Sequence, residues 1–237
     1  TLERGCIDAL FIADIHGIYD TYGGSRDAAL RHAVQTPGAD PLLIISALAM
    51  VTKHLGFACT YSTTYHSPYE CARAFTSLDH YTNGRIGWNV VTSYMKSAQD
   101  NGLGEMLPHD ERYERADEYM DVVYKLWEGS WEDDAVVRDL DHDVYTDPAR
   151  VHSINHHGEY FSVTGPYMCE PSVQRTPVIY QAGSSPRGLE FGAKHAEAVF
   201  MRLGEPPAAR EQVDFFRERL ESYGRDSGSV KILMPFT

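Results

Sequence analysis

Short apolar runs alternate with amphipathic segments along almost the whole chain, and this alternation restricts the possible folds more than any other feature of the sequence. The runs have the length of strands that are buried on both faces. The segments between them repeat apolar residues every three or four positions, as helices do. A repeated strand–helix order predicts a parallel sheet covered by helices. We predict strands at 8–14, 56–64, 84–93, 177–183, 196–201 and 231–236.

Three of the predicted helices begin at a capping residue that is followed by proline. An Asp or Ser side chain can accept a hydrogen bond from a free N–H of the first turn, and proline fits the first helical position. These pairs are Asp40-Pro41, Ser67-Pro68 and Ser185-Pro186. Longer helices are predicted at 109–127 and 205–223 from the spacing of apolar residues. In the helix after Asp40, the residues expected to face the core are Leu43, Ile44, Leu48 and Val51.

Two α/β folds satisfy this pattern, a doubly wound open sheet and a (β/α) barrel. The nucleotide-binding patterns G-x-G-x-x-G and G-x-x-x-x-G-K-[ST] are absent, which favours the barrel. Residues 1–5 look like the last turn of a helix, and the chain ends inside a strand. We therefore expect one partial (β/α)8 TIM barrel over residues 1–237, without its first strand and a C-terminal part. The poorly periodic segment 129–176 is expected to be a functional insertion or a cover over the site.

The charge balance and the hydropathy pattern argue against several classes of protein. The chain carries 34 acidic and 21 basic side chains, a net charge of −13, whereas a nucleic-acid-binding surface is basic. The longest apolar run, 42–51, is far shorter than the roughly 20 residues of a membrane span. We also expect no signal peptide. Because the four cysteines form no C-x-x-C pair, we expect reduced thiols in a cytoplasmic protein.

The strongest local indication of a binding site is the segment YQAGSSPRG, residues 180–188. It joins a predicted buried strand to a helix that starts at Pro186. Free backbone N–H groups and the helix dipole favour an anion at such a start. Gly183 permits close approach, and the hydroxyls of Ser184 and Ser185 can donate hydrogen bonds, which suits a phosphate group. The segment alone leaves open the alternative that Ser185 only caps its helix.

Polar residues at other predicted strand and helix ends are expected near this phosphate loop. His109 and Tyr113 are four residues apart on one face of a helix start, where both could donate hydrogen bonds. The alternative for this pair is a capped first turn that faces solvent. Asp14, Thr60 and Asn89 each lie at the C-terminal end of a predicted strand, where barrels place their ligand sites. We expect these strand ends to converge on one rim.

Two other kinds of site find little support in the sequence. His152, His156 and His157 lie in the 129–176 segment, but no cysteine or acid at ligand spacing completes a zinc site, so we expect no metal. No G-x-S-x-G follows a strand, which argues against a Ser-His-Asp hydrolase. The acidic residues between 133 and 143 are expected to form a solvated face.

Four long segments closely resemble one known group of enzymes. They are GRIGWNVVTS, HDERYERADEYMDVVYKLWEGSWEDDAVVRD, DPARVHSINHHGEYFSVTGP and QRTPVIYQAGSSPRGLEFGAKHAEAVF. These segments resemble the nitrilotriacetate/dibenzothiophene-sulfone monooxygenase group of the bacterial-luciferase-like flavin monooxygenases. Within that group, the sequence looks nearest to the long-chain alkane and dimethyl-sulfide branch. The likeness extends over almost the whole chain, from DALFIAD to VFM.

The resemblance implies a luciferase-like TIM barrel with insertions and a two-component, FMN-dependent monooxygenase. Such an enzyme takes reduced FMN from a separate flavin reductase and uses O2 to oxygenate a small organic substrate. The substrate classes implied here are organosulfur compounds, alkanes and aminopolycarboxylates. The cofactor supplies the chemistry while the protein binds it and excludes water, so no residue is assigned a catalytic role. Relatives commonly pair, so the resemblance also implies a homodimer or homotetramer.

Site residues follow from the same resemblance, position by position. His109, Tyr113 and the loop around Ser185 match residues that hold the flavin phosphate and ribityl side. A loop from Tyr19 to Gln35 and the insertion would shield the flavin from water. Tyr94 stands where the alkane-oxidising branch has a histidine, which argues against an alkane substrate. The implied cofactor residues are Asp14, Thr60, Asn89, His109, Tyr113, Gly183, Ser184 and Ser185, and the implied substrate residues are Tyr19, Gln35 and Tyr94.

Three alternative functions stay open at the level of the sequence. The first is a non-catalytic flavin- or phosphate-binding subunit, which would suit a native protein that lacks the first strand of the barrel. The second is a deazaflavin-dependent oxidoreductase of the same superfamily, which would prefer the deazaflavin to FMN. The third is an enzyme acting on a phosphate sugar on a similar barrel, which would show no dependence on flavin.

Overall fold

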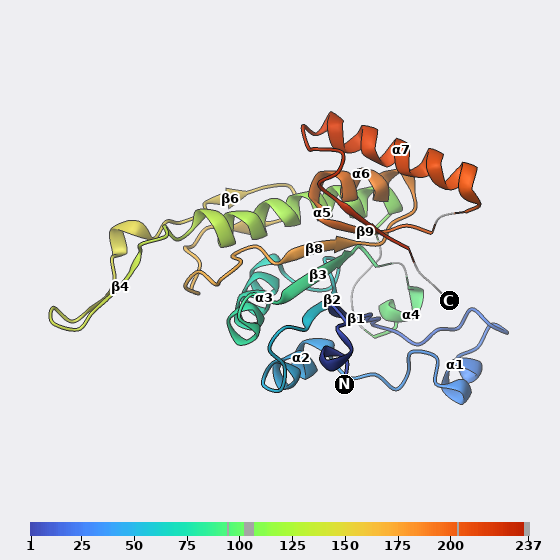
Figure 1. Cartoon of the computed structure of the whole chain (residues 1–237), viewed down its shortest axis with the longest axis horizontal. Helices are drawn as coiled ribbons and strands as arrows, with labels where there is room; N and C mark the ends of the chain where they lie inside the picture. The colour runs from blue at the N-terminus through green and yellow to red at the C-terminus, as the bar shows by residue number, and fades with distance from the viewer. Residues whose placement is uncertain (94, 102–106, 203, 235–237) are drawn as a thin grey trace.

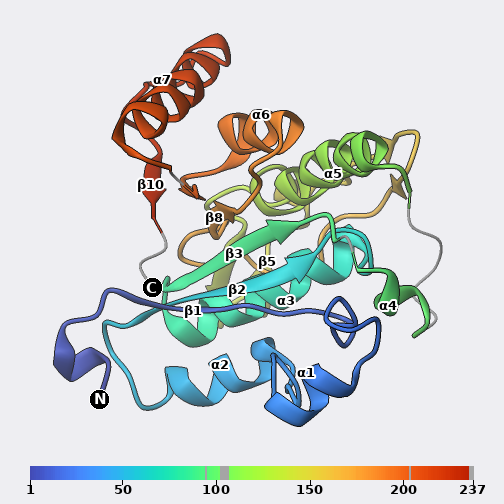
Figure 2. The same cartoon turned by 90° about the vertical axis from the view of Figure 1, so that its right-hand side faces the viewer.

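Six parallel strands form one curled sheet in the computed structural model, which describes residues 1–93, 95–101, 107–202 and 204–234. The sheet order is β1-β2-β3-β8-β9-β10, so strands that follow one another in this series also lie side by side (Figures 1 and 2). All six predicted strands are present, and the sheet curls as half of a barrel does. Their bounds are β1 Ala9–Ile12, β2 Gly56–Ser62, β3 Ile86–Val91, β8 Val178–Gln181, β9 Ala198–Phe200 and β10 Lys231–Leu233.

Helices cover the convex face of this sheet, as Figure 2 shows. The longer ones are α2 Pro41–Ala49, α3 Pro68–Thr82, α5 His109–Tyr124, α6 Pro186–His195 and α7 Pro206–Ser222. Two short helices, α1 Asp27–His32 and α4 Lys96–Gln99, lie in stretches without predicted helices. Single helical turns occur at Glu3–Gly5, Lys125–Gly129 and Pro148–Arg150.

The three predicted helix starts, at Pro41, Pro68 and Pro186, are confirmed. The Asp40 side chain accepts a hydrogen bond from the Leu42 N–H at the start of α2 (2.9 Å). Ser67 does the same for the Glu70 N–H of α3 (3.2 Å). In each case proline occupies the first turn, so a local signal of two adjacent residues determines where the helix begins.

The predicted inner face of α2 is confirmed at Leu48, which packs against the core, and is wrong at the other three positions. Leu43, Ile44 and Val51 are 74%, 51% and 78% exposed, whereas Ile45 is fully buried. Apolar residues surround this helix on all sides, so their spacing does not identify the buried face, and packing against α3 and β2 selects it instead. Within the described ranges, no helix combines the length and the apolar character needed to cross a membrane.

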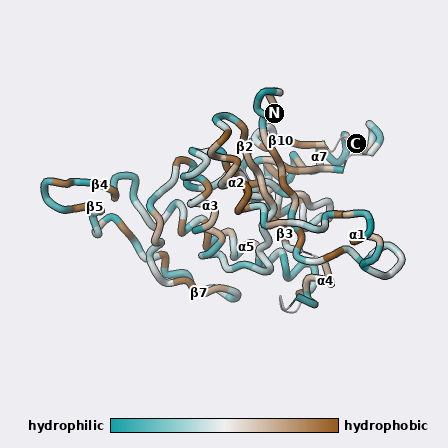
Figure 3. Tube along the Cα trace, turned by 90° about the horizontal axis from the view of Figure 1, so that it is seen from below, coloured by the Kyte–Doolittle hydropathy of each residue, from teal (hydrophilic) through white to brown (hydrophobic). Residues whose placement is uncertain are grey.

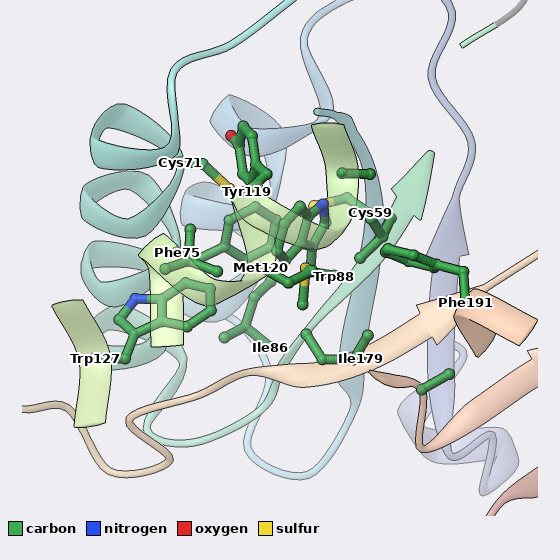
Figure 4. Packing of buried hydrophobic residues seen from close by; sticks show 14 of the residues in the cluster. Cys59, Cys71, Phe75, Ile86, Trp88, Tyr119, Met120, Trp127, Ile179 and Phe191 are labelled. Atoms are coloured by element: carbon green, nitrogen blue, oxygen red, sulfur yellow. The ribbon is translucent and has the colours of Figure 1, made fainter. Parts of the chain in front are cut away.

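The main core lies between the sheet and the helices α3, α5 and α6. The indole ring of Trp88 on β3 packs between Phe75 and Tyr119, with ring centroids 5.5 and 6.0 Å away (Figure 4). Its Nε1–H donates to the Tyr61 carbonyl oxygen at 2.9 Å, so the polar edge of a fully buried ring is satisfied. This core holds the strand ends and the start of α5 in a rigid relation.

The opposite, concave face of the sheet carries a row of residues in register. Thr60, Asn89 and Tyr180 are direct neighbours on β2, β3 and β8. The Tyr180 ring stacks on Phe200 of β9, with centroids 6.3 Å apart. Gly87 makes room for this ring, since a Cβ there would lie 2.6 Å from Tyr180 Cε2. The concave face is therefore built for aromatic side chains with a polar pair beside them.

The segment 129–176 forms two antiparallel strand pairs outside the main sheet. The pairs are β4 Val136–Asp139 with β5 Val144–Thr146, and β6 His156–His157 with β7 Ser162–Val163. The β4–β5 hairpin extends from the body as an arm, away from the carboxyl ends of the strands (Figures 1 and 3). The hairpin therefore does not cover the carboxyl ends of the strands, and the role of 129–176 as a functional insertion stays a prediction.

Candidate functional site

A cavity of about 240 Å³ lies at the carboxyl ends of β3 and β8. Its walls come from the segments that follow β1, β2, β3 and β8, from the first turns of α5, and from α6. Ligand sites of parallel α/β sheets lie at this end of the strands, because the connecting loops and helix starts meet there. The polar and titratable side chains in its wall include Asp14, His16, Tyr65, His109, Arg112 and Tyr113.

The loop from β8 to α6, where the sequence predicts phosphate binding, is a tight turn. The Gly183 N–H donates to Gln181 Oε1 at 2.8 Å, and Ser185 Oγ accepts from the Gly188 N–H at 3.1 Å. A Cβ on Gly183 would lie 3.0 Å from Gly188 Cα, and one on Gly188 would lie 2.8 Å from the Tyr113 hydroxyl. Only glycines therefore allow these two backbones and the tyrosine to meet in this turn.

The start of α5 brings His109 to the same turn. His109 Nε2 lies 3.3 Å from Ser185 Oγ, although 76 residues separate the two in sequence. The Asp110 carboxylate lies 2.6 Å from His109 Nδ1 and favours a proton on that nitrogen. With that tautomer, Nε2 accepts a hydrogen bond from the Ser185 hydroxyl, and a doubly protonated ring would instead present an N–H to an anion.

Tyr113 lies one helical turn after His109 and is 7% exposed. Its ring packs against Phe191 of α6 at 5.7 Å between centroids, and the Arg187 guanidinium lies 5.9 Å from its centroid. These contacts hold the phenol hydroxyl beside Gly183 and Gly188. The predicted pair His109–Tyr113 thus faces the phosphate turn, and the alternative of a solvent-facing first turn fails for Tyr113.

One carboxylate fastens α5 to α6 behind the turn. Asp117 accepts hydrogen bonds from Arg187 (2.7 Å), Lys194 (3.1 Å) and His195 (2.8 Å). Burial alone would raise the pKa of this carboxyl, but the three donors outweigh it and hold the pKa well below the usual value. Because α5 carries His109 and α6 carries Ser185, this network determines how far apart the two halves of the turn lie.

Asp14 lies at the rim of the cavity, just beyond the end of β1. Burial raises the pKa of its carboxyl, and the interaction with His16 opposes that rise. Nε2 of His16 is 3.2 Å from Nε2 of His66, whose ring stacks on Tyr61 at 3.8 Å between centroids. This side of the cavity therefore combines the Asp14 carboxyl with the imidazole of His16, which in turn pairs with His66.

Thr60 and Asn89 lie together, but they are not part of the cavity wall. Asn89 Nδ2 donates to Thr60 Oγ1 at 2.9 Å on the concave face of the sheet, and both residues are buried. The Asn89 side-chain oxygen has no hydrogen-bond partner within the described ranges. Their assignment to a flavin-binding surface stays a prediction.

The predicted substrate residues lie elsewhere. Tyr19 and Gln35 line a separate open hollow of about 610 Å³, beside α1, together with Tyr22 and His32. Tyr94 lies outside the described residues. The structure thus brings Asp14, His109 and Tyr113 into one cavity wall with the Ser185 turn beside them, and it leaves the substrate-side assignments as predictions.

The three histidines of the 129–176 segment point to separate partners. His152 Nε2 is 2.8 Å from Glu132, His156 Nε2 is 3.1 Å from Glu118, and His157 Nδ1 is 3.0 Å from the Ser162 hydroxyl. Across the part of the chain that the structure describes, no three His, Cys, Asp or Glu side chains are arranged to hold a metal ion.

Sequence reasoning missed several residues of the cavity wall. Arg112 lies three positions after His109, on the helix face that faces the cavity, and this spacing could have identified it. His16 and Tyr65 follow strands by a few residues, in loops without a recognisable pattern. Their place in the site depends on loop conformation, which residue type alone does not indicate.

Comparison with known proteins gives consistent matches along the chain. The model of the family "Luciferase-like monooxygenase" matches residues 1–237. A long-chain alkane monooxygenase of Geobacillus thermodenitrificans is 59% identical over 232 residues, 98% of this chain and 53% of the relative. A dimethyl-sulfide monooxygenase of Hyphomicrobium sulfonivorans is 54% identical over 237 residues, 100% of this chain and 49% of the relative. The chain therefore spans about half the length of these curated relatives.

Solved structures agree with the sequence matches. The crystal structure of a long-chain alkane monooxygenase superposes with a TM-score of 0.95 at 58% identity, covering 98% of this chain and 54% of that one. A riboflavin lyase, solved with modified FMN and riboflavin, superposes with a TM-score of 0.92 at 42% identity, covering 97% of this chain and 52% of that one. The curled sheet and its helices thus have the same arrangement as in these proteins.

Proposed function

Because the chain belongs to the luciferase-like monooxygenase family, we propose that it is a two-component monooxygenase that uses reduced FMN and O2 to oxygenate a small organic molecule. The observation that carries this proposal is the turn between β8 and α6. Gly183, Gly188 and the Ser185 hydroxyl form a cradle beside His109 and Tyr113, and its donors and the start of α6 suit a phosphate group.

The chain's own residues would bind and orient the cofactor. His109, Tyr113 and Ser185 would donate hydrogen bonds to its phosphate, assisted by the dipole of α6. The cavity wall beside Asp14, His16 and Arg112 would then face the ring system. Reduced FMN bound there would supply the two electrons with which O2 is activated. The surrounding apolar wall would limit the entry of water, which otherwise wastes the reduced cofactor.

The substrate and the partners are part of the same proposal. Relatives named for alkanes, dimethyl sulfide, dibenzothiophene sulfone and nitrilotriacetate support a small organic substrate. We assign the hollow beside Tyr19 and Gln35 to the substrate side. A separate flavin reductase would deliver reduced FMN, the protein would act in the cytoplasm, and it would assemble as a homodimer or homotetramer.

The phosphate assignment is tested by Ser185→Ala. This change removes a hydroxyl that donates to an anionic group, so we expect FMN to bind about tenfold more weakly. It also removes the cap of α6, which costs about 1 kcal/mol of stability. The measurement is a titration of FMN fluorescence, with thermal unfolding followed in parallel.

Two controls separate binding from folding in this test. Ser185→Thr keeps a capping hydroxyl and should retain most of the affinity. Riboflavin lacks the phosphate, so its affinity should be the same for the wild type and for Ser185→Ala. An unchanged dissociation constant for FMN in Ser185→Ala would contradict the assigned phosphate site.

Rapid mixing with oxygen tests the activity itself. Protein loaded with reduced FMN under anaerobic conditions is mixed with O2, and flavin absorbance is followed. A reoxidation rate well below that of free reduced FMN is the expected result, because a site that limits the entry of water shields the flavin. Reoxidation at the rate of the free flavin would count against the monooxygenase proposal.

A further inference from the structure

One cation in the cavity wall has no role in the phosphate turn. Arg112 lies in the first turns of α5, and its side chain lines the cavity. Its Nε is buried and has no hydrogen-bond partner within the described ranges. An unpaired buried guanidinium nitrogen carries a desolvation cost that a folded protein normally offsets with an acceptor.

Other partly buried arginines of this chain do have acceptors. Arg115, one turn further along α5, donates to the Thr63 carbonyl oxygen. Arg175 donates to two backbone carbonyls, and Arg187 donates to Asp117 at 2.7 Å. Arg112 differs in this respect, although acidic side chains are abundant in a protein with a net charge of −13. In the part of the chain that the structure describes, Arg112 forms no ion pair, which indicates a site prepared for an external anion.

The neighbours of Arg112 locate that anion away from the phosphate turn. Burial raises the pKa of the Tyr65 phenol, and Ser93 and the nearby Arg112 cation oppose this rise. The Tyr65 ring in turn lies 5.0 Å from the His16 ring, next to Asp14. His109 is instead the residue of α5 that reaches Ser185. Arg112 therefore lies on the wall that Asp14, His16 and Tyr65 form with the end of β3, the wall that the proposed function assigns to the ring system.

We propose that the Arg112 guanidinium binds the anionic edge of the reduced flavin ring and so makes this site prefer reduced flavin to oxidised flavin. Two-electron reduction leaves a negative charge on the N1–C2 carbonyl edge, whereas the oxidised ring is neutral there. A planar guanidinium can donate two parallel hydrogen bonds to such an edge. The inference rests on the proposed function, because it requires a flavin in this cavity.

The test compares wild type, Arg112→Met and Arg112→Lys with reduced and oxidised forms of both FMN and riboflavin under anaerobic conditions. Dissociation constants come from equilibrium titrations, and the midpoint potential of the bound flavin is measured independently. For Arg112→Met we expect about tenfold weaker binding of the reduced form and little change for the oxidised form. A tenfold loss of affinity for the reduced form alone corresponds to about 30 mV for a two-electron couple, so the midpoint potential of the bound flavin should fall by about 30 mV. For Arg112→Lys, the affinity for reduced flavin should lie between that of the wild type and that of Arg112→Met.

A control variant and a folding measurement accompany this test. Arg217→Met changes an exposed arginine of α7 in the same way and should leave all four affinities unaltered. Thermal unfolding shows whether Arg112→Met is folded. The inference is overturned if Arg112→Met weakens FMN but not riboflavin, since Arg112 would then serve the phosphate, or if both redox states lose affinity equally or not at all. A wild-type protein that binds no flavin would instead refute the proposed function.

Discussion

Asp117→Asn is expected to lower the free energy of unfolding by about 3 kcal/mol at neutral pH. The Asp117 side chain is 19% exposed, pairs with the cations Arg187 and Lys194, and accepts a hydrogen bond from His195, all on α6. An amide has no charge and can accept from only part of this set, so positive charges stay partly buried without compensation. The change is measured by denaturant unfolding of this chain at pH 7.

The pH dependence of this effect has a definite sign. The pKa of Asp117 in the folded protein is well below its usual value of 3.8. The carboxylate therefore stabilises the fold fully above the unfolded-state pKa, and this stabilisation is lost as the pH falls below it. We expect the gap in stability between wild type and Asp117→Asn to be constant near pH 7 and to shrink below about pH 4.

Glu114→Gln is the matched control, because Glu114 lies on the same helix with an exposed side chain. This variant should change stability by less than about 0.5 kcal/mol. Equal stabilities of Asp117→Asn and wild type at pH 7 would show that the network does not fasten α5 to α6. A gap that persists unchanged at pH 3 would contradict the electrostatic cause.

Gly188→Ala is expected to weaken FMN binding on the order of 100-fold, by the loss of about two hydrogen bonds to a charged group. In an exposed helix this substitution stabilises by about 1 kcal/mol. Here the new Cβ would lie 2.8 Å from the Tyr113 hydroxyl and 3.1 Å from both Gly183 Cα and Ser185 Oγ. Tyr113 and the turn must therefore move apart, which disturbs the donors that the phosphate requires.

Fluorescence titration of FMN measures this loss, and Gly165→Ala serves as its control. A Cβ on Gly165 meets no atom within 4 Å, so neither affinity nor stability should change. The double variant Gly188→Ala with Tyr113→Phe removes the hydroxyl that clashes, so it should recover thermal stability without recovering FMN affinity. Wild-type FMN affinity in Gly188→Ala would show that the cradle does not hold the phosphate.

The local elements of this fold could be predicted because their signals lie within a few residues. Asp40, Ser67 and Ser185 each precede a proline and each cap a helix where expected. The six strands are apolar runs that need no tertiary information to be recognised. The inner face of α2 could not be predicted, since Leu43 and Ile45 are equally apolar and only packing distinguishes them.

The candidate site also has parts that could be predicted from local sequence and parts that could not. By itself, the sequence determined the glycine–serine turn after β8, the helix that starts there, and the polar helix start at His109, because capping and glycine conformation are local properties. Only the tertiary structure decided that His109 meets Ser185 across 76 residues, that Asp117 fastens α5 to α6, and that Arg112 enters the cavity without a partner in the described chain. These contacts depend on how two helices pack on a curled sheet, over a buried aromatic core around Trp88, and such packing joins residues that are far apart in the sequence.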